Sequence, residues 1–266
     1  MEDEVIKTAS AEWQVLSTGY AGDTWIVLHG FGQHAVLMLR FMEIVKPNDR
    51  VISINLPFHG NTKMIEPNLN VNDLDDLIGR ILRNENVERC SLLGYSLGGK
   101  VALKLAELSP GKVERMVLIA PDGLKLNRFY LFATRTKLGN FLFRRAMKDP
   151  SRLLSICSIA VKLNLMDERI LTFYQNQLSK PETREMIYGS WQAFKNINPN
   201  LIQIRKNIFR YKIKTELFFG KHDRVIHPRL AKKLSGVNGK TSTVHFLDRG
   251  HDLTSSEAAQ KIKNLL

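Results

Sequence analysis

The segment that decides the fold lies at residues 90–99 and reads CSLLGYSLGG. Its first part, Cys90 to Leu93, is a short apolar run of the kind found in a buried strand. After the segment, Val101, Leu105 and Leu108 recur at helical spacing. The pattern therefore predicts a strand that turns sharply into a helix.

Ser96 lies where the predicted strand becomes the predicted helix. A turn this tight forces the serine into a strained backbone conformation and lifts its hydroxyl above the sheet. The flanking Gly94 and Gly98 leave room for the neighbouring strand and helix. The amides that follow point outward at the helix start, where they stabilise negative charge. These features predict a nucleophilic serine.

The same segment has a competing interpretation as a phosphate-binding loop. Gly94, four further residues and then Gly99-Lys100 match the spacing of such a loop. The loop also needs a serine or threonine after the lysine to hold magnesium, and the residue here is Val101. The nucleotide interpretation therefore lacks one of its ligands.

The composition is that of a globular protein with one large domain, or one domain and an insert. The 266 residues are 44% hydrophobic, which is enough for a sizeable core. No apolar stretch approaches the roughly 20 residues that cross a bilayer. The acidic start, residues 1–4, has no apolar signal core, so a cytoplasmic protein is expected. Cys90 and Cys157 are isolated and predict neither a disulfide framework nor a metal site.

Positive charge is concentrated in one part of the chain. The formal net charge is +13, and residues 124–212 carry 17 Lys and Arg against 5 Asp and Glu, a net charge of +12. Solvated helix faces explain such an excess, and so does attraction of an anionic substrate or an anionic membrane surface. A basic surface without a defined motif is weak evidence for a partner, and no nucleic-acid partner is predicted.

Apolar strands alternate with helices before about residue 123 and again after about residue 213. The predicted strands cover residues 13–16, 25–28, 51–54, 90–93, 116–120, 216–219 and 243–247, and the predicted helices cover residues 34–45 and 73–82, a segment ending at 108 and the chain after 254. This alternation indicates an α/β fold with a mostly parallel sheet flanked by helices. Ligand sites of such sheets lie beyond the carboxyl ends of the strands.

Between the two alternating parts the pattern changes to helices alone. Residues 124–212 are therefore predicted to be an inserted helical cap, and residues 1–123 and 213–266 the core domain. Helix starts are expected at Asp149-Pro150, Asp167-Glu168, Lys180-Pro181 and Asn198-Pro199.

One stretch of the predicted cap is rich in large apolar residues. They are Phe129, Leu131, Phe132, Leu138, Phe141, Leu142, Phe143 and Met147. A helix that is apolar on more than one face must bury both faces. These side chains are therefore expected either to fill the interior of the cap or to roof a hydrophobic substrate pocket.

A nucleophilic serine needs a base to take its proton, usually an imidazole held by a carboxylate. His251 follows a late predicted strand after Gly250, and Asp223 ends the strand before it. Both are expected at the sheet rim that carries Ser96. Asp122, which ends another strand, is an alternative acid.

The remaining histidines are assigned no chemistry. His29 and His59 are interpreted as structural, with His29 shaping the loop after its strand. His222 and His227 flank Asp223, but no clear set of ligands accompanies them, so no metal site is predicted.

The sequence resembles an α/β-hydrolase fold enzyme, a serine hydrolase with a helical cap, over essentially the whole chain. Residues 94–99 resemble the nucleophile elbow of that family. Residues 220–223 and 250–251 resemble its acid and histidine loops. The order Ser96, Asp223, His251 is also the order of the family.

The segment at residues 29–32, HGFG, resembles the oxyanion loop of the same family. The resemblance implies that the backbone amides of Phe31 and Leu97 are the two oxyanion donors.

The resemblance implies a cofactor-free, metal-free hydrolase that acts on a small-molecule carboxylic ester, hydrophobic or anionic. Ser96 is expected to attack the acyl carbonyl while His251 takes its proton and Asp223 orients the imidazole. Two alternatives stay open. The same serine can serve in hydrolysis of a carbon-carbon bond in an acidic substrate held by arginines of the cap, or the fold can serve a non-catalytic ligand receptor.

Overall fold

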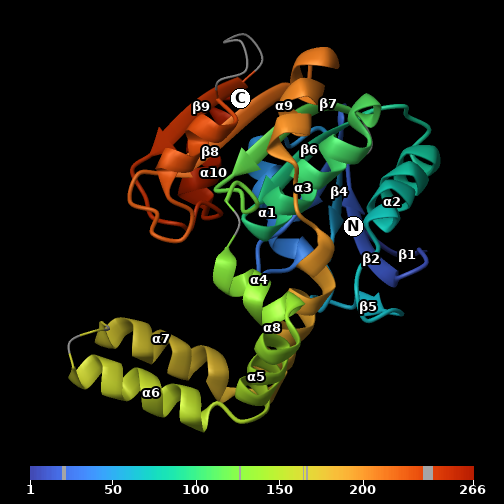
Figure 1. The fold of residues 1–266 in the computed structure, drawn as a ribbon. Helices are drawn as coiled ribbons and strands as arrows, with labels where there is room; N and C mark the ends of the chain where they lie inside the picture. The colour runs from blue at the N-terminus through green and yellow to red at the C-terminus, as the bar shows by residue number, and fades with distance from the viewer. Residues whose placement is uncertain (20–21, 126, 164, 166, 236–241) are drawn as a thin grey trace. The chain divides into compact units, whose positions relative to one another are not determined.

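The computed structural model describes residues 1–19, 22–125, 127–163, 165, 167–235 and 242–266, without the side chains of residues 169, 170 and 173. The chain divides into two compact units. The sheet unit comprises Met1–Lys125 and Asn196–Leu266, and the helical unit comprises Leu126–Lys195 (Figure 1).

Within the described residues, the strands of the sheet unit form one nine-stranded sheet in the order β1-β2-β4-β3-β6-β7-β8-β9, with β5 paired to β2. The strands are β1 (Glu2–Lys7), β2 (Ala11–Thr18), β3 (Thr24–Leu28), β4 (Arg50–Ile54), β5 (Lys63–Met64), β6 (Cys90–Tyr95), β7 (Val113–Ile119), β8 (Lys214–Gly220) and β9 (Ser242–Leu247). From β4 through β9 neighbouring strands are parallel, whereas β2 is antiparallel to β1, β4 and β5. The predicted mostly parallel sheet is confirmed.

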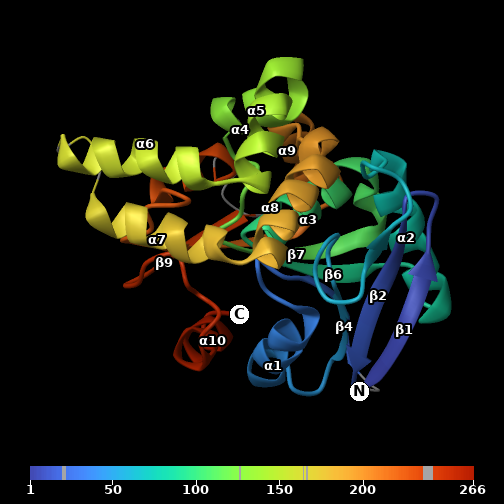
Figure 2. The same ribbon diagram turned by 90° about the horizontal axis from the view of Figure 1, so that it is seen from below.

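Helices cover the sheet on both faces, so its central strands are largely buried. Every residue of β6 is buried. The helices of this unit are α1 (Ala35–Val45), α2 (Val71–Asn84), α3 (Leu97–Leu108), α9 (Leu201–Arg210) and α10 (Ser256–Lys263), with short 3-10 turns at Pro110–Lys112 and Pro228–Lys233. Figure 2 shows α1 and α10 on one side of the sheet and α2, α3 and α9 on the other.

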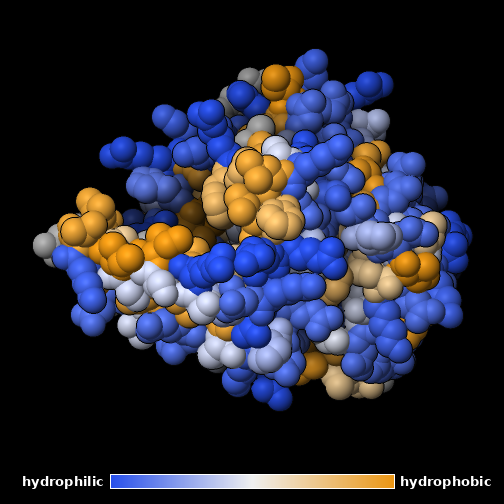
Figure 3. Space-filling view, turned by 60° about the horizontal axis from the view of Figure 1, so that its bottom comes forward, coloured by the Kyte–Doolittle hydropathy of each residue, from blue (hydrophilic) through white to orange (hydrophobic). Residues whose placement is uncertain are grey.

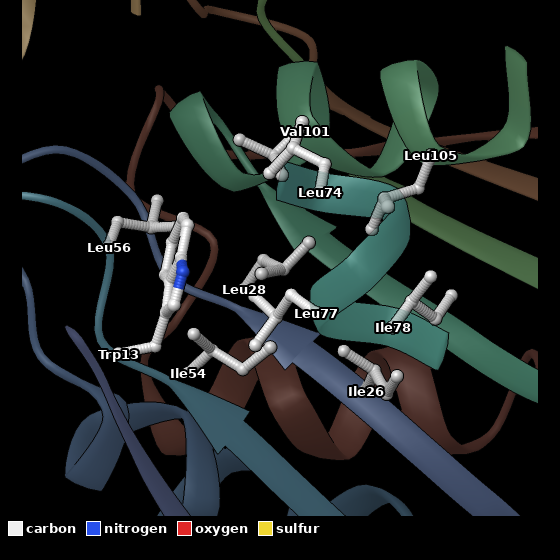
Figure 4. Close-up of a pocket in the computed structure, with 10 residues that line it drawn as sticks. All are labelled: Trp13, Ile26, Leu28, Ile54, Leu56, Leu74, Leu77, Ile78, Val101 and Leu105. Atoms are coloured by element: carbon white, nitrogen blue, oxygen red, sulfur yellow. The ribbon is translucent and has the colours of Figure 1, made fainter. Parts of the chain in front are cut away.

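A small cavity remains in the core between the sheet and helices α2 and α3 (Figure 4). Its lining is entirely apolar: Trp13, Ile26, Leu28, Ile54, Leu56, Leu74, Leu77, Ile78, Val101 and Leu105. The indole N–H of Trp13 donates to Thr8 Oγ1 instead, at 3.0 Å. Without a polar group to orient a ligand, the cavity is a gap in core packing.

The helical unit consists of α4 (Arg128–Arg135), α5 (Lys137–Lys148), α6 (Ser151–Lys162), α7 (Glu168–Ser179) and α8 (Pro181–Ala193), followed by a 3-10 turn at Phe194–Asn196. Helices α6, α7 and α8 begin at the predicted starts. Asp149, for example, accepts a hydrogen bond from the Ser151 amide at 3.0 Å. Among the described residues, no helix is both long and apolar enough to cross a membrane.

The helical unit ends at Lys195, so residues 196–212, which the sequence assigned to the insert, belong to the sheet unit. Helix α9 is tied to α3 by polar contacts. The side-chain amide of Asn207 donates to the backbone carbonyl of Glu107 at 3.1 Å. The backbone amide of Asn200 donates to the Glu107 carboxylate at 2.7 Å. The contacts between α9 and α3 connect residues far apart in the sequence. A helical pattern is local, so it does not show which unit a helix belongs to.

The apolar stretch of α4 and α5 is mostly exposed, contrary to the expectation that it fills the interior of the insert. The exposed fractions are 64% for Phe129, 41% for Phe132, 62% for Leu138, 61% for Phe141 and 47% for Leu142, whereas Phe143 is 9% exposed. A small residue lies where α4 and α5 meet. A Cβ on Gly139 would lie 2.1 Å from the Phe132 carbonyl oxygen, so α4 and α5 approach too closely for a larger side chain there.

Candidate active site

The parallel strands bring the predicted site residues to one rim of the sheet unit. Ser96 follows β6, Asp223 follows β8 and His251 follows β9. The loop at residues 29–32 follows β3, which is parallel to the same set of strands. All four therefore emerge beyond carboxyl ends of parallel strands, where ligand sites of such sheets lie.

The backbone of Ser96 is strained and firmly held. Its φ of 48° and ψ of −111° are unusual for a residue with a side chain. The Ser96 amide donates to the Ile119 carbonyl at 2.9 Å, and the Ser96 carbonyl accepts from the amides of Asp122 at 2.9 Å and Lys100 at 3.2 Å. These hydrogen bonds, on both sides of the residue, fix the turn from β6 into α3.

The glycines around Ser96 are required by close backbone approach. A Cβ on Gly98 would lie 2.1 Å from the Leu28 carbonyl oxygen, and one on Gly94 would lie 2.6 Å from the Gly98 carbonyl oxygen. The prediction that they leave room for the neighbouring strand and helix is confirmed. Lys100, which a phosphate-binding loop would need beside its ligand, is only 6% exposed within α3.

Ser96, His251 and Asp223 meet in one line of hydrogen bonds. The distance from His251 Nδ1 to Asp223 Oδ2 is 2.7 Å, and the distance from His251 Nε2 to Ser96 Oγ is 3.1 Å. With the ring proton on Nδ1 donated to the carboxylate, Nε2 accepts the serine hydroxyl proton. This arrangement can remove that proton as the serine attacks a substrate.

Asp223 is buried and fully engaged, with 2% of its surface exposed. Its second oxygen, Oδ1, accepts from the amides of Val225 and Ile226, each at 2.8 Å. Burial alone would raise the pKa of the carboxyl, but the hydrogen bonds from His251 and from these two amides outweigh it and the pKa is lowered. The carboxylate therefore stays charged beside the imidazole.

The alternative acid and the flanking histidines have other partners. Asp122 turns its carboxylate to its own loop and accepts from the Gly123 amide at 2.7 Å. His222 Nε2 lies 2.8 Å from Asp248 Oδ1, and His227 Nδ1 accepts from the Arg229 amide at 3.1 Å. No group of three or more His, Cys, Asp or Glu side chains that could hold a metal ion occurs in the described part of the chain.

The two backbone amides that the sequence assigns to the oxyanion site are uncommitted among the described residues. Across the described residues, neither the Phe31 amide nor the Leu97 amide donates a hydrogen bond. The neighbouring amides are occupied: Gly30 donates to Gln33 Oε1 at 3.1 Å and Gly32 donates to His59 Nε2 at 2.9 Å. The loop is thus fixed by the amides on either side of Phe31.

His29 and His59 are structural, as predicted. His29 Nε2 accepts from the Leu56 amide at 3.0 Å, and burial lowers the pKa of His29 to about 3. His59 donates from Nδ1 to the Pro57 carbonyl at 2.9 Å, and burial also lowers its pKa. Both rings are neutral near pH 7, as their acceptor roles require.

Sequence reasoning missed two residues that link the site loops. The Tyr95 hydroxyl donates to the His251 carbonyl at 3.1 Å, and the two rings have centroids 5.5 Å apart. Gln33, which holds the Gly30 amide, also donates to Thr254 Oγ1 at 3.1 Å. No local pattern signals either contact, because each joins residues far apart in the sequence.

Comparison with known proteins gives one family. The family model for the alpha/beta hydrolase fold matches residues 26–257. Among curated proteins, the chain is 21% identical over 212 residues to a putative esterase/lipase of Mycoplasma genitalium, covering 77% of this chain and 79% of that protein. It is 24% identical over 268 residues to the monoacylglycerol lipase ABHD6 of Bos taurus, covering 91% and 73%.

A third relative matches over a shorter range. It is the dihydrolipoyllysine-residue acetyltransferase component of the acetoin cleaving system of Pseudomonas putida, 30% identical over 106 residues that make up 40% of this chain and 29% of that protein. The chain thus matches under a third of the length of that relative.

Solved structures show the same fold. A thermophilic esterase from Thermogutta terrifontis has a TM-score of 0.71 at 16% identity, covering 100% of this chain and 98% of that one. A putative epoxide hydrolase from Pseudomonas aeruginosa has a TM-score of 0.66 at 16% identity, covering 99% and 93%. Because these neighbours differ in reaction, the fold leaves the chemistry to the site residues.

Proposed function

Because the chain is an enzyme of the α/β hydrolase fold family, we propose that it is a serine hydrolase of carboxylic esters with Ser96 as nucleophile. The observation that carries the proposal is the line of hydrogen bonds from Asp223 through His251 to Ser96, at 2.7 and 3.1 Å. Nucleophile, base and orienting acid are each within reach of the next, as covalent catalysis by a serine requires.

In the proposed first step, Ser96 Oγ attacks the ester carbonyl and its proton passes to His251 Nε2. The imidazole becomes positively charged, and the Asp223 carboxylate stabilises that charge through Nδ1–H. The protonated His251 then gives its proton to the leaving alcohol, which departs and leaves an acyl group on Ser96. Because the pKa of Asp223 is lowered, its carboxylate is already charged before the imidazole becomes positive. No proton has to leave Asp223 during the step.

The amides of Phe31 and Leu97 are the proposed oxyanion donors. They would stabilise the negative charge that forms on the substrate oxygen in the transition state. Each donor of this kind contributes about 3 to 4 kcal/mol. The support for this assignment is that both amides are free of other hydrogen bonds among the described residues while the amides of Gly30 and Gly32 are occupied.

In the proposed second step, water attacks the acyl group on Ser96 while His251 removes a proton from the water. The same two amides would stabilise the second tetrahedral intermediate. When this intermediate collapses, the bond between the acyl carbon and Ser96 Oγ breaks and His251 gives its proton to Oγ. The carboxylic acid product then leaves. The cycle needs no metal and no cofactor.

We assign the helical unit the role of a cap that selects the substrate. Its residues are inserted directly after the loop of Asp122, whose amide holds the Ser96 carbonyl at 2.9 Å. Its exposed apolar side chains suit an apolar acyl or alcohol group, and its basic residues suit an anionic substrate.

The experiment that tests the proposal is turnover of an acyl-ester series by the full chain, together with labelling by a serine-directed fluorophosphonate. We expect ester hydrolysis and a single label on Ser96. The variant Ser96→Ala should lose on the order of 10⁴- to 10⁶-fold in kcat. Ser91→Ala is a matched control, because Ser91 lies on the same buried strand and should keep full activity. Near wild-type esterase activity in Ser96→Ala would end the proposal.

The carbon-carbon hydrolase alternative uses the same three residues and differs only in substrate. A parallel assay with an acidic diketone separates the two reactions by their products. Faster turnover of the diketone than of every ester would replace the ester proposal. Labelling of Ser96 without turnover of either substrate would favour the receptor alternative.

A further inference from the structure

We propose that the helical unit docks the protein on an anionic lipid bilayer surface through helices α5 and α6. Both helices expose a row of large apolar side chains. On α5 the row is Leu138, Phe141 and Leu142, and on α6 it is Ile156 and Ile159, continued by Leu163 just after the helix. Spacings of three, four and seven residues place each row on one side of its helix.

The exposure of these rows is large for apolar side chains of a folded protein. The exposed fractions are 65% for Ile156, 56% for Ile159 and 62% for Leu163, close to those of the α5 row. Figure 3 shows hydrophobic side chains, in orange, gathered on this unit and bordered by hydrophilic ones, in blue. Exposed apolar surface with a polar border marks an interaction site.

Positive charge accompanies the rows. Six basic residues occur in residues 137–162, and all six are exposed: Lys137, Arg144, Arg145, Lys148, Arg152 and Lys162. Asp149 is the one acidic residue of this segment. None of the six forms an ion pair with another residue that the structure describes. The charges are therefore available to a partner outside this chain.

On α5 the charges lie beside the apolar row. At 100° per residue, Lys137, Arg144 and Lys148 fall on one edge of the row, and Arg145 falls within it, on the same side as Leu138. Apolar side chains on one side of a helix with basic side chains at their edge are typical of helices that lie in a membrane interface. The apolar row would enter the boundary of the acyl chains, and the basic groups would meet lipid phosphates.

Other occupants fit these charges less well. A single small substrate has one or two anionic groups, which do not account for six exposed cations. Protein interfaces are depleted in lysine, and two of the three basic residues on the edge of the α5 row are lysines. Nucleic acid would match the charge but leave the exposed Leu, Ile and Phe side chains without a partner.

The test is sedimentation of the full-length Ser96→Ala protein with vesicles, so that hydrolysis of lipid cannot affect the result. Vesicles of phosphatidylcholine alone are compared with vesicles that also contain phosphatidylglycerol, at low and at high salt. We expect binding to the anionic vesicles that weakens as salt screens the charges. Equal binding to both kinds of vesicle, or no binding to either, would overturn the proposal.

Two paired variants separate the apolar and the charged contributions. We expect Leu138→Ser/Phe141→Ser to lose tenfold or more of its binding at every salt concentration. We expect Arg144→Glu/Lys148→Glu to bind anionic vesicles no better than neutral ones. All four positions are exposed, so thermal unfolding should be unchanged, and this is checked first.

Matched controls on the sheet unit change the same kinds of residue elsewhere. Ile65→Ser removes an apolar side chain that is 56% exposed, and Lys63→Glu/Arg83→Glu reverses two exposed charges. Both should bind like the parent protein. Turnover of a soluble ester is measured with the same helical-unit substitutions in the protein that keeps Ser96. If these substitutions leave vesicle binding normal but lower ester turnover, the apolar row serves the substrate and the docking proposal is wrong. That outcome would leave Ser96 as nucleophile.

Discussion

The sheet unit and the helical unit use their apolar residues in opposite ways. In the sheet unit, large side chains such as Trp13, Trp25 and Phe218 are completely buried. In the described part of the helical unit, the buried hydrophobic residues are few: Ala133, Phe143, Cys157, Leu178, Ala193 and Phe194. Its larger apolar side chains lie mainly on the surface. The same residue types thus build a core in one unit and lie exposed on the surface of the other.

This difference fits a division of labour. The proposed proton transfer would require Ser96, His251 and Asp223 to keep their distances to within a few tenths of an ångström, and a densely packed sheet provides that precision. Recognition of an apolar group requires exposed apolar surface, which costs stability and so is best confined to a separate unit.

The largest expected effect distinguishes the two candidate acids of the sheet unit. Asp223→Asn should lower kcat about 10⁴-fold, because the amide favours the wrong imidazole tautomer while its shape is nearly unchanged. Asp122→Asn should lower kcat less than tenfold, since its carboxylate accepts from Gly123 and not from His251. Steady-state ester hydrolysis measures both. A greater loss in Asp122→Asn would reassign the acid.

The second prediction compares a buried and an exposed phenylalanine. Phe218→Ala, in the sheet unit, should lower the free energy of unfolding by about 3 to 5 kcal/mol, because Phe218 is 0% exposed and leaves a cavity. Phe129→Ala, in the helical unit, should lower it by less than about 1 kcal/mol, because Phe129 is 64% exposed. Urea unfolding at neutral pH gives both values. Similar losses would contradict the comparison of the two units.

The sequence was sufficient to predict the sheet and the three residues that meet at its rim. Each of Ser96, Asp223 and His251 directly follows an apolar strand. Once the strands are taken as parallel, their carboxyl ends must lie on one side, so the residues that follow them come together. This inference needs only local patterns and one topological rule. It did not require knowing which strands are neighbours.

Features that depend on contacts between distant residues were not predictable in this way. The hydrogen bond from Tyr95, the last residue of β6, to the His251 carbonyl joins residues 156 positions apart in the sequence. Strand β1 was missed because its residues are mostly polar and exposed. The exposure of the α5 apolar row was not foreseen either, since periodicity identifies the side of a helix that is apolar but does not identify what that side meets.

The third prediction concerns acid sensitivity, which should belong to the sheet unit. All seven histidines lie outside residues 126–195. His29 has a pKa of about 3 in the folded protein, against 6.5 ordinarily, because it is buried. Between these two values the unfolded chain binds a proton that the folded protein does not, so stability falls as the pH drops from about 6.5 towards 3.

Urea unfolding at about pH 7 and about pH 4 tests this sign, with an expected loss on the order of a few kcal/mol. His29→Gln keeps an acceptor for the Leu56 amide and removes the titrating group. It should therefore show a smaller loss of stability between the two pH values. An identical loss in the variant would assign the acid sensitivity to other groups.

The smallest expected effect concerns the hydroxyl of Tyr95 as a positioning group for His251. Tyr95→Phe removes the hydrogen bond to the His251 carbonyl and keeps the ring. A neutral hydrogen bond contributes about 1 kcal/mol, so kcat should fall about five- to tenfold with little change in KM. The rate of fluorophosphonate labelling of Ser96 should fall by the same factor, because both reactions need His251 in place.

A matched change in the helical unit separates positioning from general destabilisation. The Tyr188 hydroxyl donates to Asn140 Oδ1 at 3.2 Å, so Tyr188→Phe also removes one hydrogen bond and keeps the ring. It should leave kcat and the labelling rate unchanged, because no residue of the Ser96 site depends on that bond. Equal losses in the two variants would mean that the rate reports overall stability, and the proposed role of Tyr95 would be withdrawn. A loss confined to Tyr95→Phe would mean that the reaction rate depends on the position of the His251 loop. A displacement of the imidazole by a few tenths of an ångström would lengthen the 3.1 Å contact between His251 Nε2 and Ser96 Oγ, and so slow proton transfer.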